Sequence, residues 1–534
     1  MRAFLVGICV LAACGDDGVS TEPITFGAMG PLAGDAGRGG FRFGAATAAT
    51  QIEDMNTRTD WYAWTAPASL GGLGKGTFVG DAVRGYSKAL DDVQLVKTMG
   101  LDSYRFSIEW ARIEPMRDVI DEAAITHYRD QLMALKALGI RPLVTLHHFS
   151  NPVWVADPRL ASCAAGPTDD NLCGLGHPQG GALVVEEMAE HAALIGARFG
   201  DLVDEWGTLN EPVNYLIAAY GLGIFPPGRM TIFQLLTDFV PVLRDYIAAH
   251  AKMYDALKAS DTIDADGDGD PAVVGLSLSV ADWQPSRGNS PSDREEDRAA
   301  RERLVYLFHF AFIDALRDGT FNSQLIGTPD EQHPDWTGRI DWLGIQYYFR
   351  AGVSGANPVI PAPVSLTPCT NGIDFGACLQ TTNDTFCVPQ MGYEYWADGI
   401  RTILIDFKLR YPDLPLVVSE AGIATDVGAR RAENVVRTLE AIARARDENG
   451  VDVRGYYHWS LTDNFEWAEG YEPHFGLYRV NYDTYDRSAT TGADVLNTIA
   501  HARSVTADQR KQYGGLGAMT PEGVETDKFC SQVK

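Results

Sequence analysis

The chain has 534 residues, of which 45% are apolar and 22% are charged, and its formal net charge is -27. These proportions exclude a disordered protein and allow a large packed core. The negative charge repels nucleic acid and anionic lipid surfaces, so we expect neither as a partner, whereas a neutral ligand is indifferent to that field.

The first 14 residues have the pattern of a secretory signal, with one arginine and a short apolar run before Cys14. The run is too short to span a bilayer. Residues 11–14 (LAAC) resemble the lipobox of bacterial lipoproteins, which implies cleavage before Cys14 and lipidation of that cysteine. The alternative is an ordinary signal with an incidental cysteine. We expect an exported protein, periplasmic or at the cell surface, that contacts a membrane only through this anchor.

Beyond the signal, the composition divides the chain into three parts. Residues 15–40 are rich in glycine, aspartate and proline and are predicted to form a tether. Residues 41–504 are predicted to form one domain, and residues 505–534 a C-terminal tail.

Within the predicted domain, apolar and β-branched runs alternate with longer amphipathic stretches, such as residues 85–100, 187–200 and 431–450. The runs predicted as strands are residues 41–47, 102–108, 140–147, 202–209, 272–280, 340–348, 415–420 and 453–460. Eight strands alternating with helices predict an α/β protein, a single (β/α)8 TIM barrel with elaborated loops after its strands. An open doubly wound sheet is the alternative, but no GxGxxG motif follows the first strand.

Two glutamates each follow a strand candidate, Glu211 in WGTLNEP and Glu420 in VVSEAG. The carboxyl ends of all strands of such a barrel meet at one rim, where catalytic groups lie. Two facing carboxylates can cleave a glycosidic bond, because one protonates the leaving oxygen while the other meets the sugar cation. The alternative is that each glutamate is a structural carboxylate paired with a helix or an arginine.

Other polar and aromatic residues fall on the same predicted rim. They are Gln51 after the first strand, Arg105 on the second, His148 after the third, Tyr348 at the end of the sixth, and residues 459–466 after the eighth. Taken singly, each is better explained as a core residue or as a satisfied polar residue at a strand end. Their common position favours a binding pocket.

Several of these segments resemble motifs of the family 1 glycoside hydrolases: YRFSI (104–108), TLNEP (208–212) and WSLTDNFEWAEGY (459–471). The likeness runs from about residue 41 to about residue 503. It implies a retaining, exo-acting β-glycosidase that hydrolyses β-glucosides or related β-glycosides, with Glu211 as general acid/base and Glu420 as nucleophile. No cofactor and no metal are expected. Two alternatives stay open: a transglycosylase that uses the same glycosyl-enzyme intermediate, and a non-catalytic sugar-binding surface protein.

The resemblance also implies roles for the residues around the two glutamates. Gln51, His148, Asn210 and Glu466 are expected to bind sugar hydroxyls, Glu466 at C4 and C6. Trp459 and Trp467 are expected to form an apolar floor and wall, Tyr348 to hydrogen-bond the nucleophile, and Arg105 to keep it ionised. Three positions depart from the family pattern, namely Phe149, Gln346 and Ala421, which puts the sugar preference in doubt.

Six cysteines remain beyond Cys9 and Cys14: Cys163, Cys173, Cys369, Cys378, Cys387 and Cys530. An even number in an exported protein predicts three disulfides, of which Cys163–Cys173 is the most local. Metal binding by these thiols is the alternative, but their spacing is not that of a zinc site. The stretch DADGDGD (264–270) starts like a calcium loop but has Gly275 at the twelfth position instead of glutamate, so we predict a solvated turn.

Overall fold

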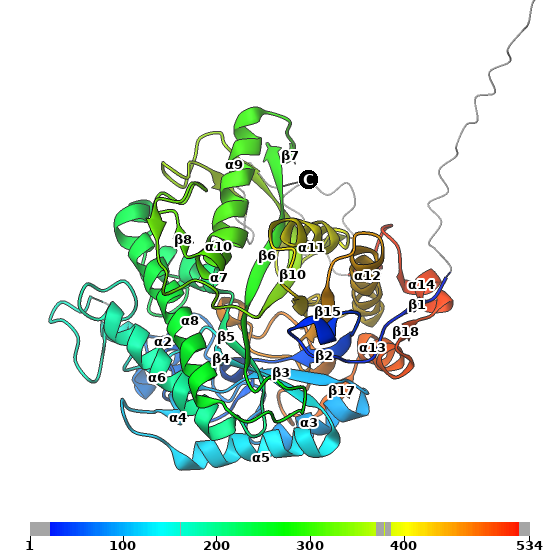
Figure 1. The fold of residues 1–534 in the computed structure, drawn as a ribbon, viewed down its shortest axis with the longest axis horizontal. Coiled ribbons are helices and arrows are strands. Elements are labelled where there is room, and N and C mark those ends of the chain that lie inside the picture. The colour runs from blue at the N-terminus through cyan, green and yellow to red at the C-terminus, as the bar shows by residue number, and fades with distance from the viewer. Residues whose placement is uncertain (1–21, 161, 370–378, 380–385, 523–534) are drawn as a thin grey trace, which may run out of the picture.

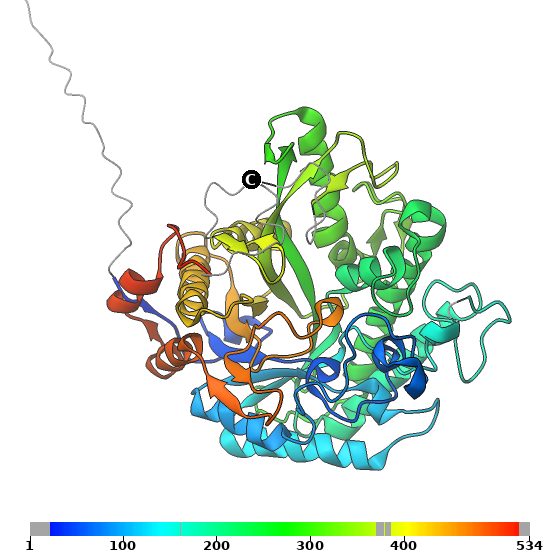
Figure 2. The same ribbon diagram turned by 180° about the vertical axis from the view of Figure 1, so that it is seen from behind.

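The computed structural model describes residues 22–160, 162–369, 379 and 386–522. Within these residues, eight parallel strands close a barrel in the order β2-β3-β4-β5-β6-β10-β14-β15, and β15 pairs with β2 to complete the circle. Helices surround the barrel (Figures 1 and 2). The predicted (β/α)8 barrel is confirmed.

The bounds of the elements are as follows. The barrel strands are β2 (Arg42–Ala46), β3 (Ser103–Ser107), β4 (Arg141–His147), β5 (Glu205–Asn210), β6 (Val273–Arg287), β10 (Trp342–Ser354), β14 (Leu416–Ala421) and β15 (Val453–Trp459). The helices are α1 (Ala49–Ile52), α2 (Asp60–Thr65), α3 (Ala89–Thr98), α4 (Trp110–Ile113), α5 (Glu122–Leu138), α6 (Gly181–Phe199), α7 (Pro212–Leu216), α8 (Val240–Ser260), α9 (Glu295–Val305), α10 (Ala311–Asp318), α11 (Gly399–Arg410), α12 (Gly428–Asp447), α13 (Thr491–Ala502) and α14 (Ala507–Tyr513). The short strands are β1 (Ile24–Thr25), β7 (Ser290–Pro291), β8 (Thr320–Phe321), β9 (Glu331–Gln332), β11 (Thr367–Pro368), β12 (Cys387–Val388), β13 (Tyr393–Glu394), β16 (Tyr478–Val480), β17 (Arg487–Ala489) and β18 (Ser504–Val505).

Helix α5 illustrates how the sequence specifies the outer layer. The side chain of Asp121 accepts hydrogen bonds from the first free backbone N–H groups, and Gly139 ends the helix at a φ of 71°. Between these caps, Tyr128, Leu132 and Leu135 recur at intervals of four and three and are fully buried. Each such side chain contributes about 1.5–3 kcal/mol by its burial.

Strands β6 and β10 are longer than predicted. We expected them to end at residues 280 and 348, but they continue to Arg287 and Ser354 and stay paired with each other as far as Val353 and Pro285. They project beyond the barrel towards β7 (Figure 1). Trp283 and Val353 are buried in this projection, so apolar packing continues past the rim and sustains the extended backbone.

The opposite end of the barrel is closed by a segment that we expected to be a tether. Strand β1 pairs with β18, Leu32 is fully buried, and the carbonyl oxygen of Gly30 accepts a hydrogen bond of 2.7 Å from Arg42. Residues 24–40 are therefore part of the folded domain, a correction to the predicted boundary. The predicted signal and Cys14 lie outside the described residues.

The predicted C-terminal tail is docked on the domain as far as residue 522. Arg510 in α14 bonds Glu440 of α12 at 2.7 Å, and the chain then continues along α12 to the other end of the barrel. There Glu522 accepts a hydrogen bond of 2.7 Å from Thr425, which follows β14. Arg430 connects this segment to the loop after β10, because it donates to the carbonyl oxygens of both Thr520 and Cys387.

The cysteines follow the prediction where they can be compared. Cys163 and Cys173 form a disulfide with a Cα–Cα separation of 5.7 Å, as predicted. Cys369 and Cys387 are also disulfide-bonded, while Cys378 and Cys530 lie outside the described residues. No helix in the described part of the chain combines the length and the apolar character that crossing a membrane requires.

Candidate active site

Glu211 lies at the carboxyl end of β5, in a left-handed backbone conformation with φ 42° and ψ 58°. Its backbone N–H donates a hydrogen bond of 2.7 Å to the carbonyl oxygen of Ser277 on β6, which helps to hold this conformation. A non-glycine residue in this region stores strain and is found most often at functional sites. Pro212 then begins helix α7, and Asn214 in the same turn donates a hydrogen bond of 2.7 Å to the Glu211 carboxylate.

Glu420 lies near the end of β14, and its two carboxylate oxygens have different partners. Oε1 accepts a charge-assisted hydrogen bond from Arg105 on β3. Oε2 accepts a hydrogen bond of 2.6 Å from the hydroxyl of Tyr348 on β10. The structure thus brings Arg105 and Tyr348 to Glu420, as the sequence predicted.

The two carboxylates are both buried, with exposed fractions of 7% for Glu211 and 4% for Glu420. Burial raises the pKa of Glu211 to about 8, and the charge of Glu420 is the second cause of this rise. Burial also raises the pKa of Glu420, but Arg105 and Tyr348 oppose this rise because they stabilise its charged form.

Asn210, the residue before Glu211, is held by two donors. Its amide oxygen accepts hydrogen bonds of 2.6 Å from Arg105 and 2.8 Å from Gln346. Arg105 therefore bridges Asn210 and Glu420 across the barrel. Gln346 is one of the positions where the chain departs from the family pattern, and it gives Asn210 this second partner.

Of the residues expected to bind sugar hydroxyls, Gln51 contacts Glu466, which lies in the loop after β15. Gln51, in α1, donates hydrogen bonds to the carbonyl oxygen of Phe465 at 2.9 Å and to Glu466 at 3.3 Å. Asn464 donates to the same carboxylate at 2.8 Å. Burial raises the pKa of Glu466 to about 7, while Asn464 lowers it and the charge of Glu420 raises it further.

Aromatic rings complete this part of the rim. The ring of His148 lies nearly parallel to those of Trp459 and Trp467, at centroid distances of 5.8 and 6.1 Å. Burial lowers the pKa of His148 well below its usual value, and Arg105 lowers it further, so the imidazole is neutral. Phe149 packs against Trp467 at 5.3 Å.

The sequence analysis assigned no role to three residues that hydrogen-bond to the predicted site residues. Asn214, Gln346 and Asn464 each bond one of the predicted site residues. The signal for Asn214 and Asn464 was their position in the chain, because they lie three residues after Glu211 and two before Glu466. Gln346 was marked only as a departure from the family pattern, because its contact with Asn210 depends on which strands face each other across the barrel.

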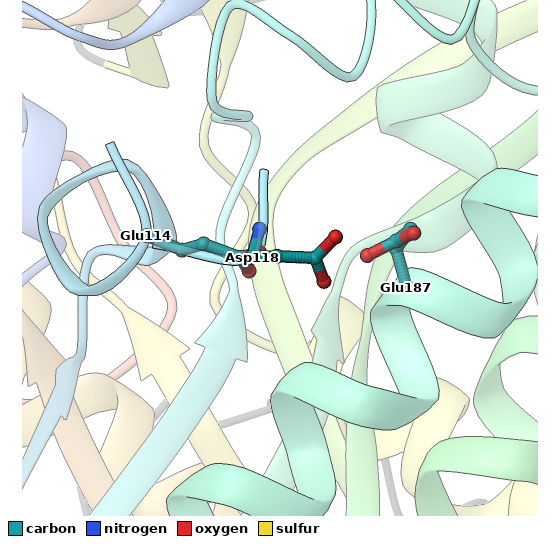
Figure 3. A group of neighbouring side chains, drawn as sticks. All are labelled: Glu114, Asp118 and Glu187. Atoms are coloured by element: carbon teal, nitrogen blue, oxygen red, sulfur yellow. The ribbon is translucent and has the colours of Figure 1, made fainter. Parts of the chain in front are cut away.

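Two acidic clusters lie away from this site. In each cluster, one oxygen from every residue lies within 4.8 Å of the others: Glu114, Asp118 and Glu187 form one, shown in Figure 3, and Asp204, Asp264 and Asp266 form the other. In the first, Glu187 bonds Arg117 and Glu114 accepts from Trp110. In the second, Asp264 accepts from backbone N–H groups of its own loop, which makes a capped turn of the DADGDGD stretch. We assign a metal to neither cluster.

The rim therefore carries two buried carboxylates with unlike surroundings, flanked by polar and aromatic side chains from the ends of other strands. On a (β/α)8 barrel, this combination defines the site of an enzyme that cleaves glycosidic bonds.

The chain belongs to glycosyl hydrolase family 1, whose model matches residues 35–504. Its relatives include a β-galactosidase of Pyrococcus woesei, 31% identical over 84% of this chain and 93% of the relative. A coniferin β-glucosidase of Pinus contorta is 30% identical, over 83% and 87% of the two chains. Among solved structures, a β-glycosidase from Pyrococcus horikoshii matches with a TM-score of 0.73 and 28% identity, covering 91% of this chain and 98% of that one. The protein is thus a family 1 β-glycosidase.

Proposed function

We propose that the protein is a retaining, exo-acting β-glycosidase of β-glucosides or related β-glycosides, with Glu420 as nucleophile and Glu211 as general acid/base. The observation that carries this assignment is the contrast between the two carboxylates. Glu420 has a cation and a hydroxyl donor that favour its charged form, whereas the pKa of Glu211 is raised to about 8. One group is prepared to attack and the other to give a proton.

In the first step, a Glu420 oxygen bonds to the anomeric carbon while the bond from that carbon to the leaving oxygen breaks. The proton of Glu211 passes to the leaving oxygen. The amide oxygen of Asn210 is occupied by Arg105 and Gln346, which leaves its amide nitrogen to hold a sugar hydroxyl.

In the second step, water attacks the anomeric carbon, gives a proton to Glu211 and releases Glu420 as a carboxylate. Formation of the ester has removed the charge of Glu420, which is the second cause of the raised pKa of Glu211. The pKa of Glu211 therefore falls at the point where this residue must act as a base. The same carboxylate can thus serve both steps.

A solved relative supports a covalent step of this kind. A rice β-glucosidase mutant, 25% identical to this chain and matching it with a TM-score of 0.70 over 88% of this chain and 99% of that one, was determined in a covalent complex with Glc.

A fluorosugar that traps the intermediate tests the proposal. The protein is incubated with 2-deoxy-2-fluoro-β-glucosyl fluoride, and the labelled peptide is identified by mass spectrometry. We expect one added sugar per chain, on Glu420. Labelling of another residue would contradict the assignment. So would turnover by the Glu420→Ala variant when no external nucleophile, such as azide, is added to replace the missing carboxylate. Analysis of products at high acceptor-sugar concentration separates hydrolysis from transglycosylation.

We further propose, from the N-terminal sequence pattern alone, that the protein is exported and anchored through Cys14. Expression of the full chain and a Cys14→Ser variant in a bacterial host with labelled palmitate tests this. Label is expected only on the chain that keeps Cys14.

A further inference from the structure

Asn214 is the side-chain donor that Glu211 meets in its own helix. It lies in the first turn of α7, and its Nδ2 donates a hydrogen bond of 2.7 Å to Oε2 of Glu211. No step of the proposed mechanism uses Asn214 directly. A donated N–H nevertheless stabilises a carboxylate and occupies one of its lone pairs. Both effects matter for a group that must give up a proton and take one back.

The backbone fixes Asn214 beside this carboxylate. Pro212 begins α7, and the backbone N–H of Tyr215 donates a hydrogen bond of 2.9 Å to the carbonyl oxygen of Glu211. The backbone N–H of Glu211 is itself bound to Ser277 at 2.7 Å. Asn214 is partly exposed, so its side chain does not fill the core. Replacing it therefore changes the contact with Glu211 without opening a cavity in the core.

The hydrogen bond distinguishes the two oxygens of Glu211. A protonated carboxyl group carries its hydrogen on one oxygen, and the other oxygen remains an acceptor of the carbonyl type. Because Oε2 accepts from Asn214, the proton is favoured on Oε1. A donor atom that is fixed in advance keeps the transfer of the proton to the leaving oxygen in one geometry.

Asn214 also opposes the factors that hold the proton on Glu211. Burial and, after it, the charge of Glu420 on β14 raise the pKa of Glu211 to about 8, although the hydrogen bond from Asn214 lowers it. As the proton leaves, negative charge develops on the carboxyl group. Asn214 is already in place to stabilise this charge, so no rearrangement is needed during the transfer.

Groups on three further strands face Glu211 as well. Arg105 on β3 and Ser279 on β6 lower its pKa, each by less than Asn214 does. Tyr348 on β10 keeps its own proton, because burial raises its pKa well above the usual value, and so it adds no charge. The hydrogen bond from Asn214 is thus the largest of these influences that favour the carboxylate.

We propose that Asn214 is a positioning residue for the acid/base: it holds the proton of Glu211 on Oε1 and stabilises the carboxylate that remains when this proton is transferred. This inference rests on the proposed function, because it takes Glu211 as the acid/base. In the second step, the same hydrogen bond keeps Glu211 ionised until water gives it a proton. Asn214 therefore acts on the proton in both directions.

The test compares wild type with Asn214→Leu, which removes the donor and keeps a side chain of similar size. kcat/KM on an alkyl β-glucoside is measured as a function of pH, and it falls at high pH because Glu211 loses its proton. We expect this fall to move up by about one pH unit, since the charged form has lost a hydrogen bond. A fall that stays at the wild-type pH, or moves down, overturns the proposal.

The leaving group gives a second measurement on the same variant. Below the fall, we expect about a tenfold loss of kcat/KM on the alkyl β-glucoside, whose leaving group needs the proton. Little loss is expected on 2,4-dinitrophenyl β-glucoside, whose leaving group departs unprotonated. Equal losses on the two substrates count against the role of Asn214.

Asn214→Asp extends the series, because an ionised aspartate cannot donate and adds a like charge beside Glu211. We expect the fall in kcat/KM at a still higher pH than in Asn214→Leu. A fall at the wild-type pH in this variant contradicts the proposal, whatever the result with leucine.

Tyr215→Phe is the matched control in the same helix. The Tyr215 hydroxyl accepts a hydrogen bond of 2.9 Å from Asn151, so this variant removes a hydrogen bond of α7 that is not made with Glu211. We expect the fall in kcat/KM at the wild-type pH. A shift as large as that of Asn214→Leu would show a general effect of the helix and overturn the proposal.

Glu211→Gln separates the two proposals. If its loss of activity depends on the leaving group while the pH profile of Asn214→Leu matches that of wild type, only the role of Asn214 is refuted. If the loss in Glu211→Gln is equal on both substrates, the acid role of Glu211 fails and the role of Asn214 fails with it.

Discussion

Two arginine–glutamate pairs lie inside the barrel, one near each end. At the end where the strands begin, Glu205 of β5 is bound through both oxygens by Arg42 and also by Arg141 at 3.4 Å. At the end where the strands finish, Glu420 is bound by a single arginine nitrogen and a tyrosine hydroxyl. All four side chains of the two main pairs are at least 95% buried.

The difference shows how one kind of ion pair serves two purposes. A carboxylate clamped on both oxygens by guanidinium groups has its charge fully matched, and such a pair holds strands together. A carboxylate with one nitrogen and one hydroxyl partner stays charged yet keeps lone pairs for a reaction. Removing each partner in turn should therefore separate activity from stability.

The largest effect is expected for Glu420→Gln, which removes the proposed nucleophile and keeps the shape of the side chain. We expect kcat to fall by about 10⁴-fold or more, the scale seen when a catalytic nucleophile is removed. The measurement is turnover of p-nitrophenyl β-glucoside, with circular dichroism to show that the variant is folded. A variant that keeps a tenth of the activity would show that this pair is structural, like the other one.

A smaller effect, dependent on the leaving group, is expected for Glu211→Gln. Loss of a general acid costs about 10²–10⁴-fold when the leaving group needs a proton. We therefore expect this loss on alkyl β-glucosides and little loss in the first step on 2,4-dinitrophenyl β-glucoside, whose leaving group departs unprotonated. Equal losses on both substrates would remove Glu211 from the acid role.

Glu205→Gln tests the structural role of the ion pair at the end where the strands begin. Removing one partner of a buried ion pair leaves an uncompensated charge and costs about 3–5 kcal/mol in the free energy of unfolding. Urea unfolding measures this, and kcat per folded molecule should stay at the wild-type value. Arg141→Gln removes the 3.4 Å contact with Glu205 and a partly exposed ion pair with Asp266 at 2.9 Å, and it should cost less, because Arg42 still binds both oxygens of Glu205. A loss of kcat without a loss of stability would contradict the structural role.

The last expected effect is a change in stability that depends on pH and leaves the fold intact. The pKa of Glu211 rises from 4.5 to about 8 on folding, so the folded state holds its proton more tightly than the unfolded state does. This contribution is fully present below pH 4.5 and is lost as the pH rises to about 8. Glu211→Gln has no such group. Its free energy of unfolding, relative to that of wild type, should therefore increase as the pH rises from 4.5 to about 8. Parallel pH curves for the two proteins would mean that Glu211 is not protonated in the folded state.

Much of the fold could be predicted from the sequence, and so could the two glutamates and their direct partners, because both depend on local sequence pattern. Apolar runs marked the eight strands, and the rule that strand ends share a rim placed Glu211, Glu420, Arg105 and Tyr348 together. The Gly/Asp/Pro-rich composition of residues 15–40 predicted a tether, yet Phe26 and Leu32 within it are buried against the barrel.

What could not be predicted depends on contacts between distant segments. The second partner of Asn210 comes from Gln346, on a strand that is not next to its own. Such contacts leave no periodic trace in the sequence. The size of the pKa rise of Glu211 was equally hidden, because its main cause is burial.

The two ends of the described chain leave the barrel on opposite faces. Residue 22 lies beside α14, where Arg510 donates to the carbonyl oxygen of Glu22, whereas Glu522 lies at the rim beside Thr425. If the enzyme were immobilised on a bead or electrode through the chain before Glu22, the rim that carries the active site would face the surrounding solution. A cargo fused after Glu522 would instead stand next to the entrance and compete with arriving substrate for space.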